Sequence, residues 1–244
     1  MKTTTFLLFL LQLLFLSCIG QKNKNTYTQK LEYALKGPVK KVTTCIQSAE
    51  NGKIPTDTIN YAGKTSMTFD RLGNMLVMHR LWKADTTGKS KRRKTEFTMQ
   101  FSGQGKDISF KDSYRLEDGD LEETGGGTYV WSDDYHYTIV PSRESSYRNV
   151  VALDKEYRLL NTAFMENDSL QTIEELEFIY KNNKLQERKS KITENKDGKT
   201  EVSYRIQVVQ QSDQYGNPTL IYGYSDMDKQ KITEVLYKEY QYYE

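Results

Sequence analysis

The chain has 244 residues, 28% of them charged, and a formal net charge of +2. That length suits one large domain or two small ones and can bury a substantial core. The near balance of the two signs argues against nucleic-acid binding, and two Cys and two His leave little material for disulfides or metal centres.

The chain begins with the pattern of a secretion signal. Lys2 precedes an apolar run over residues 6–16, broken only by Gln12, and Ser17 and Cys18 follow at once. The run is about half the ~20 residues needed to span a bilayer, so it does not anchor the protein by itself. The sequence therefore predicts export from the cytoplasm.

Two processing schemes fit this segment. The stretch Leu16-Ser17-Cys18 resembles the lipobox of bacterial lipoproteins, which implies a lipoprotein-type signal over residues 1–18 and lipidation of Cys18. Alternatively, an ordinary signal peptidase cuts after Gly20 and removes residues 1–20. We expect a cell-envelope protein, attached to the outer membrane or periplasmic, with a membrane contact made through a lipid anchor. If Cys18 is not lipidated, we expect secretion.

A tether is predicted over residues 19–26, ahead of a single β-rich domain over residues 27–244. The polar stretch 21–26 has the composition of a linker. Tyr27, Leu31 and Leu35 are spaced four apart, which predicts a helix over residues 27–36. The pair Gly37-Pro38 is typical of the end of such a helix.

After Pro38 the apolar residues recur every second position, as in half-buried antiparallel strands. The sequence predicts an all-β domain, an extended antiparallel meander of stacked hairpins with one short N-terminal helix. One face of each strand should point inward, namely Phe97, Met99, Phe101, Val202, Tyr204, Ile206 and Val208. A loop at residues 141–149 leaves open whether there are one or two β lobes.

The turns between strands contain a weak repeat. Asp70-Arg71-Leu72-Gly73-Asn74 aligns with Asp213-Gln214-Tyr215-Gly216-Asn217, and residues 153–159 and 180–185 are degenerate relatives. Asp caps its own backbone, and Gly and Asn tolerate left-handed conformations, so we expect positive φ at Gly73 and Gly216. The pattern resembles the YD-repeat (Rhs-like) β-hairpin family of small secreted or lipid-anchored bacterial proteins. The resemblance implies stacked antiparallel hairpins and no particular activity.

Few residues suggest catalysis or metal binding. His136 follows Asp133 and Asp134, which offers two metal ligands where a site needs three or four. His79 alternates with apolar residues and is interpreted as structural. We therefore expect no metal and no cofactor.

Two charged clusters and two tryptophans are the remaining candidates for a functional site. We interpret the acidic residues of 117–123 and the basic run 89–94 as solvated hairpin loops. The basic run has a second interpretation, as a docking site for anionic lipid. Trp82 and Trp131 could stack on a sugar if both were exposed, but are more often core residues.

Two functions remain open at this stage. The sequence favours a non-enzymatic envelope protein that binds a protein or glycan through an exposed sheet face, with no nucleic-acid partner. The alternative is a carboxylate-dependent hydrolase acting on an envelope or extracellular polymer. A strand at or near a sheet edge is expected to carry the contact residues, Tyr237, Tyr240, Tyr242 and Tyr243.

Overall fold

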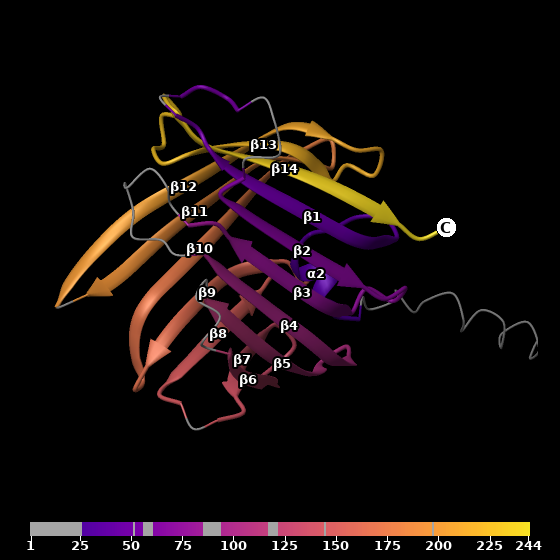
Figure 1. Cartoon of the computed structure of the whole chain (residues 1–244), viewed down its shortest axis with the longest axis vertical. Helices are drawn as coiled ribbons and strands as arrows, with labels where there is room; N and C mark the ends of the chain where they lie inside the picture. Colours follow the sequence, from indigo (N-terminus) through magenta and orange to yellow (C-terminus); the bar gives the residue numbers. More distant parts are fainter. Residues whose placement is uncertain are drawn as a thin grey trace, which may run out of the picture.

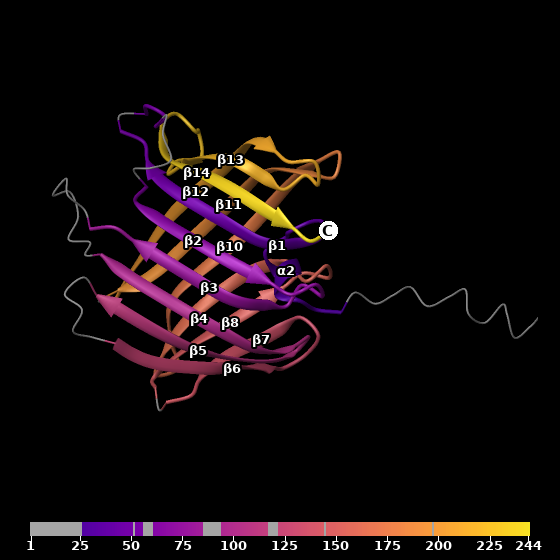
Figure 2. The ribbon, with the colours of Figure 1, turned by 45° about the vertical axis from the view of Figure 1, so that its right-hand side comes forward.

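The computed structural model describes residues 26–50, 52–55, 61–84, 94–116, 122–143, 145–196 and 198–244. Within these residues, fourteen antiparallel strands follow one another in chain order and close into a barrel (Figures 1 and 2). The prediction of an all-β antiparallel meander with one short N-terminal helix is confirmed. The expected extended sheet instead rolls up, because β1 pairs with β14 as well as with β2.

The predicted turns at Gly73 and Gly216 both separate neighbouring strands. The strands are β1 (Val39–Ser48), β2 (Gly63–Phe69), β3 (Met75–Trp82), β4 (Thr95–Gln104), β5 (Asp107–Leu116), β6 (Glu122–Trp131), β7 (His136–Pro141), β8 (Tyr147–Leu153), β9 (Leu159–Glu166), β10 (Ser169–Lys181), β11 (Lys184–Lys196), β12 (Lys199–Ser212), β13 (Pro218–Tyr224) and β14 (Ile232–Tyr242).

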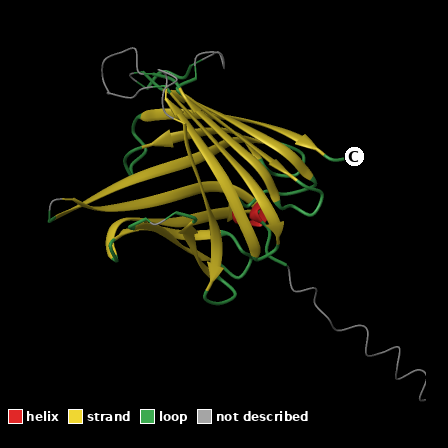
Figure 3. Ribbon diagram, turned by 60° about the horizontal axis from the view of Figure 1, so that its bottom comes forward, coloured by secondary structure: helices red, strands yellow, loops and turns green. Residues whose placement is uncertain are grey.

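The helix α2 (Gln29–Glu32) lies within the ring of strands, close to the end of β14 (Figures 2 and 3). It is much shorter than the predicted helix over residues 27–36. Ala34 adopts a left-handed φ of 53°, and the Leu35 amide turns back to the Lys30 carbonyl at 3.1 Å, which ends the helix after one turn. Tyr27 and Leu35 are both buried against the barrel wall, so packing and not helical periodicity explains their spacing. We call residues 26–36 the plug.

No helix of the described residues is long and apolar enough to cross a bilayer.

Tight turns connect the strands at the plugged end. The Asp70 carboxylate accepts hydrogen bonds from two backbone amides of its own turn, and the Asp213 carboxylate does the same in the turn between β12 and β13. Gly73 and Gly216 have φ angles of 96° and 83°, as predicted for the repeat. At the far end, the described connections are a tight turn between Glu166 and Ser169 and a longer one between Tyr224 and Ile232.

The two repeated turns hold the plug in place. The Lys30 amide donates to the Gly73 carbonyl at 3.0 Å. The Lys36 amide donates to Asn217 Oδ1 at 2.8 Å, and Asn217 Nδ2 donates to the Lys36 carbonyl at 2.9 Å. The plug is therefore fixed near its middle by a backbone hydrogen bond and at its C-terminal end by the side chain of Asn217, both from turns of the wall.

An aromatic core surrounds the start of the plug. The Tyr27 ring packs edge-on against Trp131, with centroids 4.7 Å apart, and against Tyr157 at 5.8 Å. The hydroxyls of Tyr27 and Tyr137 donate to the Glu32 carboxylate at 2.5 and 3.0 Å. Burial raises the pKa of Glu32 despite these hydrogen bonds. The plug and wall thus share one core at this end.

The wall of β2, β4 and β5 is apolar inside and polar outside. Met67, Phe69, Met99, Phe101, Ile108 and Phe110 belong to or pack against the core clusters that include the plug residues Tyr27 and Leu35. The alternating residues on the outward face include Lys64, Ser66, Thr68, Thr98, Gln100, Lys111, Ser113 and Arg115. The predicted inward direction of Phe101 and Met99 is confirmed, and Phe97 shares their face by alternation.

On strand β12 the prediction was wrong for Val202 and Tyr204, whereas Ile206 is buried as expected, at 1% exposed. Val202 is 49% exposed and Tyr204 40% exposed, on the outer face. Their polar neighbours Arg205, which is exposed, and Gln207, which is buried, line cavities of the barrel. A lumen too wide to be filled by apolar side chains can accept polar residues inside, so alternation alone does not say which face is buried.

Candidate functional site

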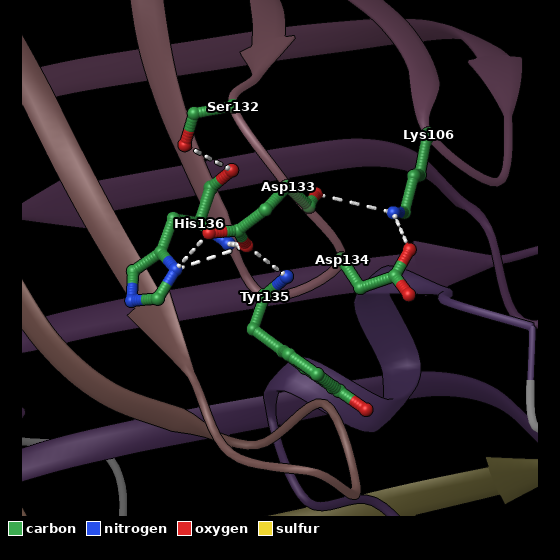
Figure 4. A network of polar contacts seen from close by, with 6 residues as sticks. All are labelled: Lys106, Ser132, Asp133, Asp134, Tyr135 and His136. Atoms are coloured by element: carbon green, nitrogen blue, oxygen red, sulfur yellow. Dashed lines mark hydrogen bonds and ion pairs between the residues drawn. The ribbon is translucent and has the colours of Figure 1, made fainter.

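The Asp133–His136 pair fixes a turn (Figure 4). Asp133 Oδ1 accepts from the amides of Tyr135 at 2.7 Å and His136 at 2.9 Å, and His136 Nδ1 lies 2.8 Å from Asp133 Oδ2. The Tyr135 amide is the main cause of the lowered pKa of Asp133. Lys106 Nζ lies 2.7 Å from Asp134. These contacts use the carboxylates for turn formation.

The other candidates divide between the wall and the undescribed residues. His79 Nε2 lies 2.7 Å from Glu96 Oε1, joining neighbouring strands β3 and β4 on their outer face. In the described part of the chain, no group of three His, Cys, Asp or Glu could hold a metal ion. Cys18, most of the basic run 89–94 and most of the acidic residues of 117–123 lie outside the described residues.

The four C-terminal tyrosines do not share one surface. Tyr240 lines an internal cavity, and the Tyr242 hydroxyl bonds Asp213 and Asn217 inside the plugged end. The Tyr237 hydroxyl donates to the Pro55 carbonyl, and the Tyr243 hydroxyl to the Phe69 carbonyl, each at 2.7 Å. All four are partly exposed. The expected edge position was wrong, because β14 is paired on both sides.

The two tryptophans lie in different regions. Trp131 packs on Tyr27 in the core of the plugged end. Trp82 lines a separate pocket, and its ring lies over Gly63, where a Cβ would approach ring atoms to 2.5 Å. They therefore form no common stacking platform, but Trp82 remains available as one wall of a binding pocket.

The barrel wall is incomplete beside β12. The pairing of β12 with β13 begins only at Ile206 and Tyr224, so in the described chain residues 199–205 have a ladder partner on the β11 side alone. The connection over residues 225–231 crosses this region, and its Lys229 forms an ion pair of 2.7 Å with Glu187. We call this part of the wall, where residues 199–205 of β12 have no ladder partner on the side of β13 and β14, the lateral opening.

A pocket of about 330 Å³ occupies this opening. It is lined from inside the barrel by Trp82 on β3, Ile192 on β11 and Arg205 on β12, and from the outer face by Tyr204 and Tyr224. Half of the lining residues are apolar or aromatic and half are polar or charged, and the volume is at the lower end of the range for small-molecule sites. Residues of both faces of the wall therefore line the pocket.

A second, largely enclosed cavity of about 60 Å³ lies deeper, between the plug and strands β10 to β14. Plug residues 33–36 form one side of it. Arg188 on β11 and Lys238 on β14 both line it, and Arg188 Nε is buried with no hydrogen-bond partner in the structure. Burial is the main cause of the lowered pKa of both groups, and Lys238 reaches a pKa of about 8.

One row of paired residues connects the two cavities. Arg188 pairs with Gln207, Gln207 with Gly223, and Gly223 with Glu234 across successive strands, so their side chains share the inner face. Gln207 Nε2 donates to Glu234 Oε1 at 3.2 Å. A Cβ on Gly223 would clash with the Glu234 side chain, so glycine makes room for this bond. Gln207 lines the deep cavity and Glu234 the lateral pocket.

Sequence reasoning missed Arg188 and Lys238. Each lies in a strand rich in charged or polar residues, and nothing local distinguishes a lumenal lysine from an outer one. The sequence does show polar residues at alternate positions, Ser203, Arg205 and Gln207. This pattern indicates a polar lumen only once the sheet is known to close into a barrel.

No family model matches the chain, and no curated protein matches it. Among solved structures, the chain is similar to a porin-like protein from Bacteroides uniformis ATCC 8492, with a TM-score of 0.45 and 11% sequence identity. The match covers 84% of this chain and 99% of that chain. A similarity of this extent does not show a family, so the function is argued from the geometry of the lumen.

Proposed function

We propose that the protein is a non-enzymatic component of the bacterial cell envelope that binds a small ligand inside its barrel. The observation that carries this proposal is the pocket of about 330 Å³ at the lateral opening, where Trp82 and Arg205 face the same space. An aromatic wall with a few converging polar groups is the usual composition of a ligand site.

The envelope location follows from two features of the chain. The first is the apolar N-terminal segment that ends at Cys18. The second is the polar outer face of strands β2, β4 and β5, which suits water, whereas a barrel in a bilayer needs an apolar outer band. A lipid on Cys18 would hold the protein at the membrane, and the first described residue, Thr26, lies beside Gly105 at the plugged end. The lateral opening is then free to receive ligand from the surrounding compartment.

Binding is favoured over hydrolysis by the composition of the pocket. Hydrolysis of a glycoside uses a pair of carboxylates on either side of the reacting bond. Among the described residues that line the lateral pocket, Glu234 supplies the one carboxylate, and it already accepts a hydrogen bond from Gln207. The arrangement therefore suits recognition of a ligand better than acid and base chemistry.

A protein or glycan partner on the outer face is the second candidate. Val202, Tyr204 and Met227 are 49%, 40% and 50% exposed near the lateral opening. They form an apolar surface beside unpaired strand backbone, which suits contact with another molecule. Tyr237 lies on β14, which also lines the deep cavity, and Tyr243 lies just after this strand. These two tyrosines need a separate test as contact residues.

The test of the lumenal site is mass spectrometry under non-denaturing conditions on protein isolated from its own envelope. We expect wild type to retain a small molecule in stoichiometric amount and Arg205→Ala and Trp82→Ala to lose it. Lys111→Ala, on the outer face of β5, is the matched control and should retain it. Wild type free of any ligand, or equal retention in all variants, would contradict the proposal.

The test of the anchor is fractionation. Cys18→Ala should move the protein from the membrane fraction to the soluble fraction, because acyl chains bind by burying methylenes at about 0.8 kcal/mol each. A wild-type protein that is already soluble would favour cleavage after Gly20.

A further inference from the structure

We infer that the enclosed cavity beneath the plug is an oxyanion site, in which Arg188 and Lys238 hold a carboxylate or phosphate group of a small molecule. This inference rests on the proposed function, since it identifies the chemistry of the ligand that the lumen receives. It also adds a second binding position, which lies deeper in the barrel than the lateral pocket.

The first argument is that both cations lack a protein counter-charge. Among the described residues, no side chain forms a hydrogen bond or ion pair with Arg188 or Lys238. Glu174 and Glu234 are near enough to act on the charge of Arg188, but neither contacts it. By contrast, Arg158 at the barrel end lies 2.6 Å from Asp154. A buried charge without a partner is costly, so the buried Nε of Arg188, with the partly buried Lys238 lining the same cavity, favours a site that receives an anion.

The second argument is the size and lining of the cavity. Its volume of about 60 Å³ is several times the ~10–15 Å³ that one water requires. It therefore has room for a small oxyanion, whereas a nucleic-acid or glycan chain cannot enter an enclosed space of this size. Leu35, Phe178 and Ile221 form apolar parts of the lining. Low polarity around the cations strengthens their attraction for an anion.

The third argument is the combination of donors. A guanidinium presents a planar fork of N–H groups that matches carboxylate and phosphate oxygens, and an ammonium adds a compact charge. Gln207 lines the same cavity with its amide. The buried Nε of Arg188 is an N–H donor for which the protein provides no acceptor. An oxyanion supplies acceptors for all of these groups at once.

The electrostatics agree with this geometry. Burial, followed by the charge of Arg188, lowers the pKa of Lys238 to about 8, so a substantial fraction of this amine is neutral when the pH is near 8. A bound anion would favour the protonated amine. Binding should therefore be accompanied by proton uptake when the pH lies near 8.

The experiment is isothermal titration of the mature chain carrying Cys18→Ala, with inorganic phosphate and with acetate as separate probes. Sodium chloride at matched ionic strength is the control for screening. We expect saturable binding of at least one probe to wild type, and a loss of affinity of about tenfold or more in Arg188→Gln and in Lys238→Met. Lys238→Arg should restore much of the affinity, and Lys111→Met, on the outer wall, should bind like wild type. Tighter binding of phosphate or of acetate identifies the group.

The outcomes separate this inference from the proposed function. If Trp82→Ala loses the native ligand but still binds the probe, both statements are supported. If wild type retains a native ligand but binds neither phosphate nor acetate, the oxyanion site is wrong and the lumenal function stands. Equal probe binding in wild type, Arg188→Gln and Lys238→Met also refutes the site. A folded Lys238→Met protein, verified by circular dichroism, ensures that lost binding is not lost structure.

Discussion

Asn217 and Lys36 exchange two hydrogen bonds across a sequence separation of 181 residues, at 2.8 and 2.9 Å. The Asn217 side chain is 1% exposed, so water does not replace these bonds easily. The same asparagine ends the turn that Asp213 organises. Asn217 therefore closes a hairpin turn and also holds the plug inside the barrel.

Replacing Asn217 with alanine should destabilise the protein by about 1–3 kcal/mol, because the backbone N–H and C=O of Lys36 lose their partners in a buried setting. Urea unfolding measures the change, and hydrogen exchange should show faster opening of residues 29–36. Gln210→Ala, on an exposed side chain of the same strand-and-turn region, is the control and should change little. Unchanged exchange in the plug would show that Asn217 does not hold it.

Replacing Gly216 with valine should cost about 1 kcal/mol or more, because a β-branched residue is disfavoured at a positive φ. The space around the position is open, since a Cβ would lie 3.7 Å from Lys184 Cγ, so conformation and not a clash decides the result. Gly216→Asn should cost less, because asparagine tolerates the left-handed region. Thermal unfolding of both variants makes the comparison, and equal losses would exclude the conformational explanation.

Replacing Lys238 with methionine should stabilise the ligand-free protein at pH 7 by about 1–3 kcal/mol. The pKa of Lys238 is lowered to about 8 from 10.5, so the folded chain binds fewer protons than the unfolded chain between these values. The free energy of unfolding of wild type therefore increases as the pH rises from 8 to 10.5, because the cost of burying the charged Lys238 amine disappears. The difference between variant and wild type should be largest below pH 8 and disappear above 10.5. The titratable groups around this amine in the same cavity are Tyr33, Lys36, Tyr180, Arg188 and Tyr240.

Denaturant unfolding at several pH values measures this effect, with Lys111→Met as control. The control should show no comparable dependence, because Lys111 is exposed on the outer face. A destabilised Lys238→Met protein at pH 7 would mean that the amine has a stabilising partner.

Glu32 should produce the opposite dependence at lower pH. Burial raises its pKa above 4.5 in the folded state, so the folded chain holds a proton that the unfolded chain releases. The stability from this group is complete below 4.5 and is lost as the pH rises through the folded pKa. Glu32→Gln should flatten that part of the stability profile, whereas Glu239→Gln, on an exposed side chain, should leave it unchanged. An unaltered profile in Glu32→Gln would contradict this role for Glu32.

Local pattern predicted the strands and turns well. The period-two runs at 97–101 and 202–208 are strands, and the turns at Gly73 and Gly216 have the expected geometry. These features depend on neighbouring residues, whose preferences are visible in the sequence. The YD-repeat resemblance concerns the same turns and stays a prediction about ancestry.

Closure of the sheet and the position of the site depended on distant residues. Nothing near Val42 shows that it pairs with Tyr240, and nothing near Tyr204 shows that its face is the outer one. The alternation of β12 has the same period with either face inward. Arg188 and Lys238 become notable only after closure and the plug enclose them together, so a local reading could not identify the cavity.

The seam between β1 and β14 also determines the order in which the molecule can form. Its two strands lie near opposite ends of the described chain, and β1 is made long before its partner. While the chain is being made, the edge of β1 stays unpaired until the last strand is complete. Such long-range pairing folds slowly and leaves strand edges open to aggregation in the meantime. A chain that ends before β14 has no route to a closed wall, and assembly of this protein is therefore completed only after its C-terminal segment has been released.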